Sequence, residues 1–187
     1  MIGFVGPLWV RLRSGAARRR IAASGPAAHA RPDAPIRVAA QAAAFVLGCV
    51  LIAWTRGEAQ RLLPAWAQGL VAAAAAITAL LSGMLQAWTA FTLGERLVIP
   101  AQARAGAPLV TTGPFGIVRH PFYLSFALWG GAAGLARGSL SGSATLVVLF
   151  LAASAWRARL EDGVLAEAYP EAYPAYAARV RAFTPHI

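Results

Sequence analysis

The fold of this chain is decided by the stretch "FYLSFALWGGAAGLARGSLSGSATLVVLFLAASAW", residues 122–156. It contains two short apolar runs, Phe122–Ala136 and Leu140–Trp156. The residues between the runs are Arg137, Gly138 and Ser139. Because a charged residue and a glycine mark a turn between two apolar helices, this pattern predicts a helical hairpin with its turn near one membrane surface.

Two longer apolar segments precede the hairpin. Val38–Trp54 carries no charge, and together with its flanks it reaches the roughly 20 residues that a membrane span needs. Trp66–Leu93 is longer than a span requires, and Gln68 and Gln86 are its strongly polar residues. With 58% hydrophobic and 13% charged residues, the chain is predicted to be an all-α, polytopic integral membrane bundle of about four spans, near 36–55, 66–93, 122–136 and 140–156.

The net charge of +10 comes from 17 arginines, and the chain has no lysine. Fourteen arginines lie in residues 1–37, in the 94–121 loop and in the tail from residue 157, whereas three lie in the other two connections. Under the positive-inside rule, this asymmetry predicts that both termini and the 94–121 loop are cytoplasmic, in a multi-pass protein of the inner or plasma membrane. Nucleic-acid binding is the other interpretation of the basic charge, but basic residues that flank apolar spans more often set topology, so we expect no nucleic-acid partner.

The first 35 residues are predicted to form an arginine-rich cytoplasmic arm, followed by a membrane domain over residues 36–187 with its tail at 157–187. The opening apolar residues precede the basic cluster, which is the wrong order for a cleaved signal peptide. Cys49 is the single cysteine, so an internal disulfide and a thiolate-built zinc site are excluded, and we expect no metal. Cys49 is interpreted as a small buried apolar residue.

The segment "GPFGIVRHPFY", residues 113–123, places Arg119 and His120 at the start of the hairpin. Pro121 suits the first turn of a helix, where its missing N–H would have no partner in any case. Taken alone, the pair can be a lipid-headgroup anchor and a residue at a helix start. The position of both side chains at the cytoplasmic end of a span also suits a polar site.

A second polar segment, "WRARLEDGVLAEAYPEAYPAYAARVRAF", covers residues 156–183. If the last helix continues into it, Arg157 and Glu161 share one face. A solvated ion pair is the simple interpretation, but arginine placed N-terminal to glutamate is the weaker orientation for helix stability, so a functional role competes with it. Tyrosines recur at 169, 173 and 176, and their predicted role is an interfacial aromatic belt, with Pro170 and Pro174 breaking or restarting the helix.

Taken together, "LVTTGPFGIVRHPFY", "RARLEDGVL" and "YPEAYPAYAARVRAFTP" resemble the isoprenylcysteine carboxyl methyltransferase family of integral membrane enzymes, to which the phospholipid N-methyltransferases are related. The resemblance covers roughly residues 90–187. It implies S-adenosylmethionine bound at the cytoplasmic face and a lipophilic acceptor, such as an isoprenylcysteine-type carboxylate or another lipid, that arrives from the bilayer.

The resemblance also implies roles for individual residues. Glu161 would contact the cofactor, and Arg157 would face the acceptor, which makes these two the expected catalytic pair. The other cofactor-binding residues implied by the motifs are Leu109, Val110, Phe115, His120, Pro121, Phe122 and Tyr123. The chain departs from the family pattern at Phe115, where a tyrosine is usual, at Asp162, where a second glutamate is usual, and at Pro170, where glycine is usual.

The residues leave two other classes of function open. One is a membrane reductase that uses a nicotinamide cofactor in a similar helical fold, and the other is a non-catalytic scaffold whose arginine arm recruits anionic partners. No glycine-rich dinucleotide loop follows a predicted strand, which weakens the reductase only modestly. The identity of the acceptor is not specified by any segment before residue 90.

Overall fold

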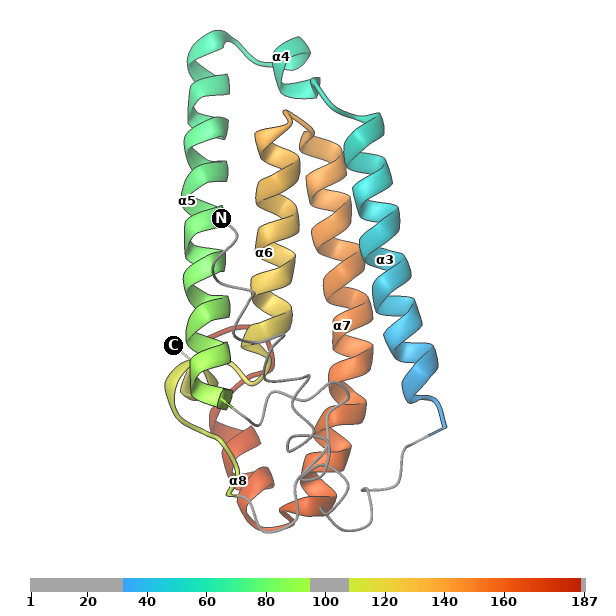
Figure 1. Ribbon diagram of the computed structural model, residues 1–187, viewed down its shortest axis with the longest axis vertical. Helices are drawn as coiled ribbons and strands as arrows, with labels where there is room; N and C mark the ends of the chain where they lie inside the picture. The colour runs from blue at the N-terminus through green and yellow to red at the C-terminus, as the bar shows by residue number, and fades with distance from the viewer. Residues whose placement is uncertain (1–31, 95–107, 186–187) are drawn as a thin grey trace, which may run out of the picture.

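The computed structural model describes residues 32–94 and 108–185, and this part of the chain consists of helices, turns and loops without a strand (Figure 1). The predicted all-α fold is therefore confirmed. Residues 1–31 of the arginine-rich arm and residues 95–107 of the loop before the hairpin lie outside the described residues. The helices are α3 (Ala34–Trp54), α4 (Glu58–Leu62), α5 (Ala65–Leu93), η2 (Gly113–Gly116), α6 (Pro121–Ala136), α7 (Leu140–Ala168) and α8 (Ala172–Arg179).

The four long helices stand side by side in the order α5, α6, α7, α3 (Figure 1). Their ends match the predicted spans to within two residues, except that α7 continues to Ala168, twelve residues beyond the predicted end at residue 156. Three of them, α3, α5 and α7, are long and apolar enough to cross a membrane. The fourth, α6, has 16 residues and packs between α5 and α7.

The predicted hairpin is present as α6 and α7. Its turn is closed by backbone hydrogen bonds from the N–H groups of Arg137 and Ser139 to the carbonyl of Gly134, each 3.0 Å long. Gly138 adopts φ +70°, in the left-handed region that glycine enters without a steric penalty. The turn predicted at residues 137–139 is therefore present in the structure.

Small residues bring the helices of the bundle close together around Leu146 of α7, which is completely buried. A Cβ atom added at Gly48 of α3 would lie 2.6 Å from Leu146 Cγ, and one added at Gly130 of α6 would lie 2.5 Å from Leu146 Cδ2. Because no real side chain tolerates such distances, the leucine fills a space that two glycines on two different helices leave open.

A short helix that the sequence did not predict, α4, fastens the far end of the bundle. The carboxylate of Glu58 accepts hydrogen bonds from the backbone N–H and the hydroxyl of Ser141 at 2.7 and 2.5 Å. These hydrogen bonds lower the pKa of Glu58, with the Ser141 hydroxyl as the largest cause. Backbone N–H groups of Gly57 and Ala59 also donate to the hairpin turn, at Arg137 and Gly138. The connection from α3 to α5 is thus tied to the start of α7.

Cys49 is exposed on α3, so the prediction that it is buried was wrong. Its neighbours Val46, Leu47 and Val50 are also at least half exposed. This face of α3 is apolar and turned away from the other helices, as a helix surface in contact with lipid tails would be, and a thiol there needs no protein partner.

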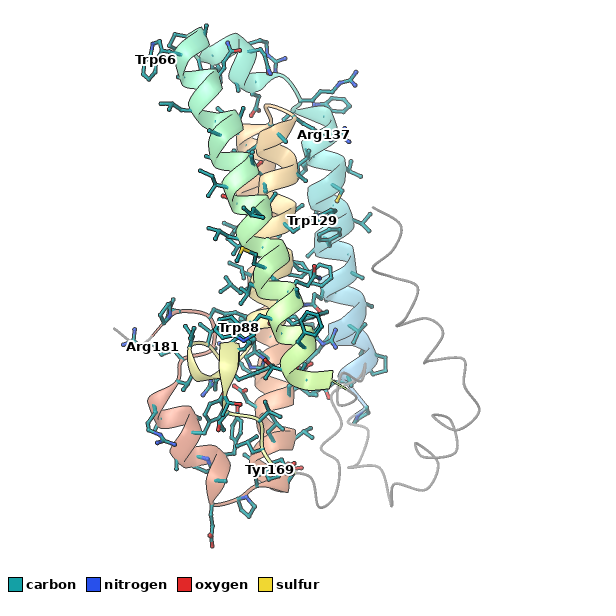
Figure 2. The ribbon with its side chains drawn as sticks, turned by 60° about the vertical axis from the view of Figure 1, so that its left-hand side comes forward. Trp66, Trp88, Trp129, Arg137, Tyr169 and Arg181 are labelled. Carbon is teal, nitrogen blue, oxygen red and sulfur yellow. The ribbon has the colours of Figure 1, made fainter. Side chains whose placement is uncertain are left out.

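The opposite end of the bundle carries the polar segments. Backbone N–H groups of Arg119 and His120 donate to the carbonyls of Arg181 and Ala182 at 2.9 and 3.0 Å. The start of α6 and the segment after α8 are therefore joined, although they lie about 60 residues apart in the sequence. Figure 2 shows Tyr169 and Arg181 at this end of the bundle, and Trp66 and Arg137 at the other.

Candidate functional site

Three elements meet at the polar end and supply most of the polar side chains of the candidate site. They are the start of α6 with the loop before it, the last three turns of α7, and α8. Pro121 is the first residue of α6, is fully buried and fixes the point at which the backbone becomes helical. The preceding residues, Arg119 and His120, are consequently held against α7.

Arg157 and Glu161 of α7 form an ion pair, because the helix continues past Trp156 and places them on one face. Arg157 Nε lies 3.1 Å from Glu161 Oε1, and 14% and 12% of the two side chains are exposed. The hydroxyl of Tyr123 donates to the same carboxylate oxygen, and the ring of Tyr123 lies under the guanidinium, 5.3 Å from its carbon. A pair this well covered is screened by water far less than a solvated surface pair.

Gln41 of α3 is a site residue that the sequence analysis missed. Its side chain is buried, its Oε1 accepts a hydrogen bond from Arg157 Nη1 at 2.8 Å, and its Nε2 donates to Ser154 at 2.7 Å. A single glutamine in the otherwise apolar first span was the signal available in the sequence. Through Gln41, helix α3 contributes to a site whose sequence motifs lie at the start of α6 and in the chain from Arg157 of α7 onward.

Asp162 of α7 receives hydrogen bonds from three donors on two other segments, the residues before α6 and α8. It accepts from Arg119 Nη2 at 3.0 Å, from His120 Nε2 at 2.9 Å and from the hydroxyl of Tyr173 on α8. Its two oxygens are thus occupied within the protein, and they join α7, α8 and the start of α6. Arg119 Nε is buried without a hydrogen-bond partner among the described residues, so Asp162 and the Ala177 carbonyl hold this guanidinium through its Nη atoms.

His120 lies between the two adjacent carboxylates. Its Nε2 is bonded to Asp162, whereas its Nδ1 is 3.6 Å from Glu161 Oε2, beyond hydrogen-bond length. The imidazole ring is nearly parallel to that of Tyr123, with centroids 5.7 Å apart, and is flanked by Phe183. Glu161 Oε2 therefore keeps capacity to accept a further hydrogen bond.

The tyrosines of α8 do not form an aromatic belt, which corrects that prediction for Tyr173 and Tyr176. Both are 4% exposed, and the hydroxyl of Tyr176 donates to the carbonyl of Phe115 at 2.7 Å. Burial raises the pKa of Tyr176 to about 12, and burial together with the Asp162 hydrogen bond raises the pKa of Tyr173 further. Both hydroxyls are therefore neutral donors in any ordinary buffer.

The other motif residues fall into two groups. Leu109 packs against the cluster of Tyr173, Tyr176 and Val180, and Phe115 joins that region through its carbonyl. Phe122 instead contacts Phe126, which packs on the apolar core of the bundle. Val110 is partly buried. The structure thus brings His120, Tyr123, Arg157 and Glu161 into one cluster, while Phe122 contacts the core of the bundle.

Comparison with known proteins identifies the family of this chain. The sequence profile described as phospholipid methyltransferase matches residues 70–172, which is more than half of the chain. The chain belongs to the phospholipid methyltransferase family. The resemblance seen in the sequence motifs is therefore confirmed at the level of this related group of membrane methyltransferases.

The segment that defines membership of the phospholipid methyltransferase family runs from the first turns of α5 to the start of α8. It includes Arg119, His120 and the Arg157–Glu161 pair, and it ends one residue before Tyr173. Helix α3, which carries Gln41, lies before it. The methyltransferase segment therefore receives one of its polar partners from outside the matched region.

A curated relative is the cobalt-zinc-cadmium resistance protein CzcN of Cupriavidus metallidurans, which is 37% identical over 84 residues. The match covers 45% of this chain and 38% of that protein, so it spans well under half of either. Among the residues that the structure describes, no group of three or more His, Cys, Asp or Glu side chains is arranged to hold a metal ion.

Proposed function

We propose that this protein is an S-adenosylmethionine-dependent methyltransferase that methylates a lipophilic anion at the membrane surface. The observation that carries the proposal is the Arg157–Glu161 pair at the polar end of an apolar bundle, with the guanidinium over the ring of Tyr123 and the carboxylate bonded to the hydroxyl of that tyrosine. Membership of the phospholipid methyltransferase family supports the reaction class.

The donor set around Glu161 fits the cofactor. Arg157 and Tyr123 both occupy Oε1, and Oε2 has His120 Nδ1 at 3.6 Å, so the second oxygen can accept a hydrogen bond from the ammonium group of S-adenosylmethionine. The stacked rings of His120 and Tyr123 offer aromatic faces suited to a cationic ligand. When bound, S-adenosylmethionine supplies a methyl group activated by a sulfonium centre.

Arg157 is assigned to the acceptor. Its Nε and one Nη1 hydrogen are held by Glu161 and Gln41, and the remaining donors of the planar fork suit an anionic group such as a carboxylate. A carboxylate is already ionised at neutral pH and needs no general base to become a nucleophile. The work of the protein is then orientation, which for ideal geometry supplies on the order of 7 to 11 kcal/mol.

The proposed orientation in the membrane places the site at the cytoplasmic surface. Fourteen of the 17 arginines fall in residues 1–37, in the 94–121 connection between α5 and α6, and in the tail from Arg157, the three parts of the sequence that adjoin the polar ends of the long helices. This distribution supports a multi-pass topology with both termini in the cytoplasm.

The experiment that tests the proposed function is methyl transfer from tritiated S-adenosylmethionine, using membranes that contain the protein, followed by extraction of lipophilic products. We expect base-labile tritium, typical of a methyl ester, in the organic phase. Base-stable label on an amine headgroup would replace the anionic acceptor with an amine. Binding of a nicotinamide cofactor, together with no heat from S-adenosylmethionine in calorimetry, would favour the membrane reductase.

A further inference from the structure

Gln41 is the buried polar residue by which α3 contacts the candidate site. Its side chain is 6% exposed, and it lies between Ser154, which is completely buried, and Arg157. The two hydrogen bonds of its amide, 2.8 Å to Arg157 Nη1 and 2.7 Å to Ser154 Oγ, both cross from α3 to α7. Gln41 itself lies outside the matched family segment, which covers residues 70–172, whereas both of its partners lie within it.

The chemistry of Arg157 fixes how the amide is oriented. A guanidinium has only donors, so the oxygen of the Gln41 amide must face it, and the amide nitrogen then faces Ser154. The carbonyl dipole therefore points its negative end at Nη1 and carries no net charge. Arg157 already has one carboxylate partner, Glu161, as Arg37 and Arg119 have Asp33 and Asp162, so the Gln41 amide is a second, uncharged acceptor on the same guanidinium.

We propose that Gln41 is a positioning residue for Arg157, and that its neutral amide fixes the guanidinium beside Glu161 without adding a second negative charge that would repel an anionic acceptor. This inference rests on the proposed function and deepens it. A hydrogen bond between membrane helices stabilises a bundle only modestly, so helix packing alone is a weak reason for a glutamine in an apolar span. A carboxylate at the same position would hold Arg157 equally well but would place a second negative charge, besides that of Glu161, next to the guanidinium.

The substitution Gln41→Glu separates these two roles. The carboxylate can accept from both Arg157 and the Ser154 hydroxyl, so the contacts persist while the charge changes. We expect binding of radiolabelled dodecanoate to protein in nanodiscs, with empty nanodiscs subtracted, to weaken about tenfold, the scale of one charge-assisted hydrogen bond, and binding of dodecylamine not to weaken. Gln68→Glu is the matched control, because it makes the same change in α5 near α4, at the other end of the bundle.

A second variant, Gln41→Leu, removes the anchor without adding charge and keeps the test decisive if Gln41→Glu fails to fold. We expect it to weaken dodecanoate binding several-fold while S-adenosylmethionine affinity in calorimetry stays within about twofold of wild type. Equal changes for dodecanoate and dodecylamine, or wild-type affinities with only a lower melting temperature, would overturn the positioning role. Absence of S-adenosylmethionine binding to the wild-type protein would instead refute the proposed function, and the dodecanoate comparison needs no cofactor.

Discussion

At the scale of single residues, two adjacent carboxylates on α7 have different surroundings. Asp162 receives hydrogen bonds from Arg119, His120 and Tyr173, whereas Glu161 has one oxygen without a protein hydrogen bond among the described residues. Asp162 therefore serves as a clamp between segments, and Glu161 remains available to a ligand. The sequence motif shows two neighbouring acids and does not distinguish these roles, because the donors come from distant segments.

Substitutions at Arg157 and Glu161 should produce separable defects. Glu161→Ala deletes the proposed partner of the cofactor ammonium, so we expect S-adenosylmethionine affinity to fall at least tenfold, the scale of a charge-assisted hydrogen bond of about 1.5 to 3 kcal/mol. Arg157→Ala should leave that affinity within a few-fold of wild type and reduce turnover at least tenfold. Arg157→Lys should recover little, because lysine lacks the planar fork.

The measurements are cofactor titration and methyl-transfer rate in nanodiscs. The control is Arg159→Ala, since Arg159 is an exposed arginine on the same helix. Small and equal effects at residues 157 and 161 would show that the pair is only an ion pair.

The substitution Asp162→Asn should destabilise the protein. It removes the charge that accepts from Arg119, His120 and Tyr173, and each lost charge-assisted hydrogen bond costs about 1.5 to 3 kcal/mol. We expect the thermal unfolding midpoint in detergent to fall by several degrees. Glu171→Gln, an exposed acid at the start of α8, should leave it unchanged. A stable Asp162→Asn protein with wild-type melting would contradict the clamp.

At the scale of elements, the lengths of the apolar runs predict most of the long helices. The end of α7 and the short helix α4 are not predicted by these lengths. The ends of α3, α5 and α6 follow from the length of apolar runs and from Pro121. The last twelve residues of α7 are charged and amphipathic, so hydropathy stops at Trp156 although the helix does not. The five-residue α4 is too short to give a periodic signal, and its stability comes from contacts with the hairpin turn.

The packing of Leu146 between glycines gives a prediction for helix association. Gly48→Ala would place a Cβ atom 2.9 Å from the Leu146 Cα, which cannot move aside as a side-chain tip can. We expect a loss of about 1 to 3 kcal/mol, the usual cost of overpacking, measured by unfolding in a denaturing detergent. Gly69→Ala on α5 is the control, because a Cβ atom there meets nothing within 4 Å. A neutral Gly48→Ala would mean that α3 is less closely packed than the structure shows.

At the scale of the whole molecule, the proposed topology follows from arginine distribution, and one cysteine makes it testable. Cys49 is first replaced in the variant Cys49→Ala, and one new cysteine is then introduced in each of two proteins, by Arg137→Cys or by Arg181→Cys. Arg137 and Arg181 lie at opposite ends of the bundle (Figure 2). We expect a membrane-impermeant maleimide to label residue 137 in intact cells, and to label residue 181 only after the cells are opened. The reverse pattern would place the site outside the cytoplasm.

The sequence predicts the helices of the bundle well, but it does not predict the side-chain contacts between them. His120, Tyr123, Arg157 and Glu161 were identified from motifs, and the structure places them together. Gln41 and the partners of Asp162 were not identified, because a contact between α3 and α7 joins residues more than a hundred positions apart and leaves no periodic trace. The tyrosines of α8 were misread because their composition resembles that of interfacial residues, whereas their burial depends on tertiary packing.

The uninterrupted length of α7 sets the depth of the reaction in the bilayer. At 1.5 Å per residue, Arg157 and Glu161 lie about 26 and 32 Å along the helix axis from Leu140, on either side of the roughly 30 Å thickness of a hydrocarbon core. A rigid helix anchored at its far end by Glu58 therefore holds the guanidinium at the plane where acyl chains give way to headgroups. Under the proposed function, lipids with longer acyl chains would move that plane past the site, so hydrophobic thickness would help to determine which amphiphiles can present their polar end to it.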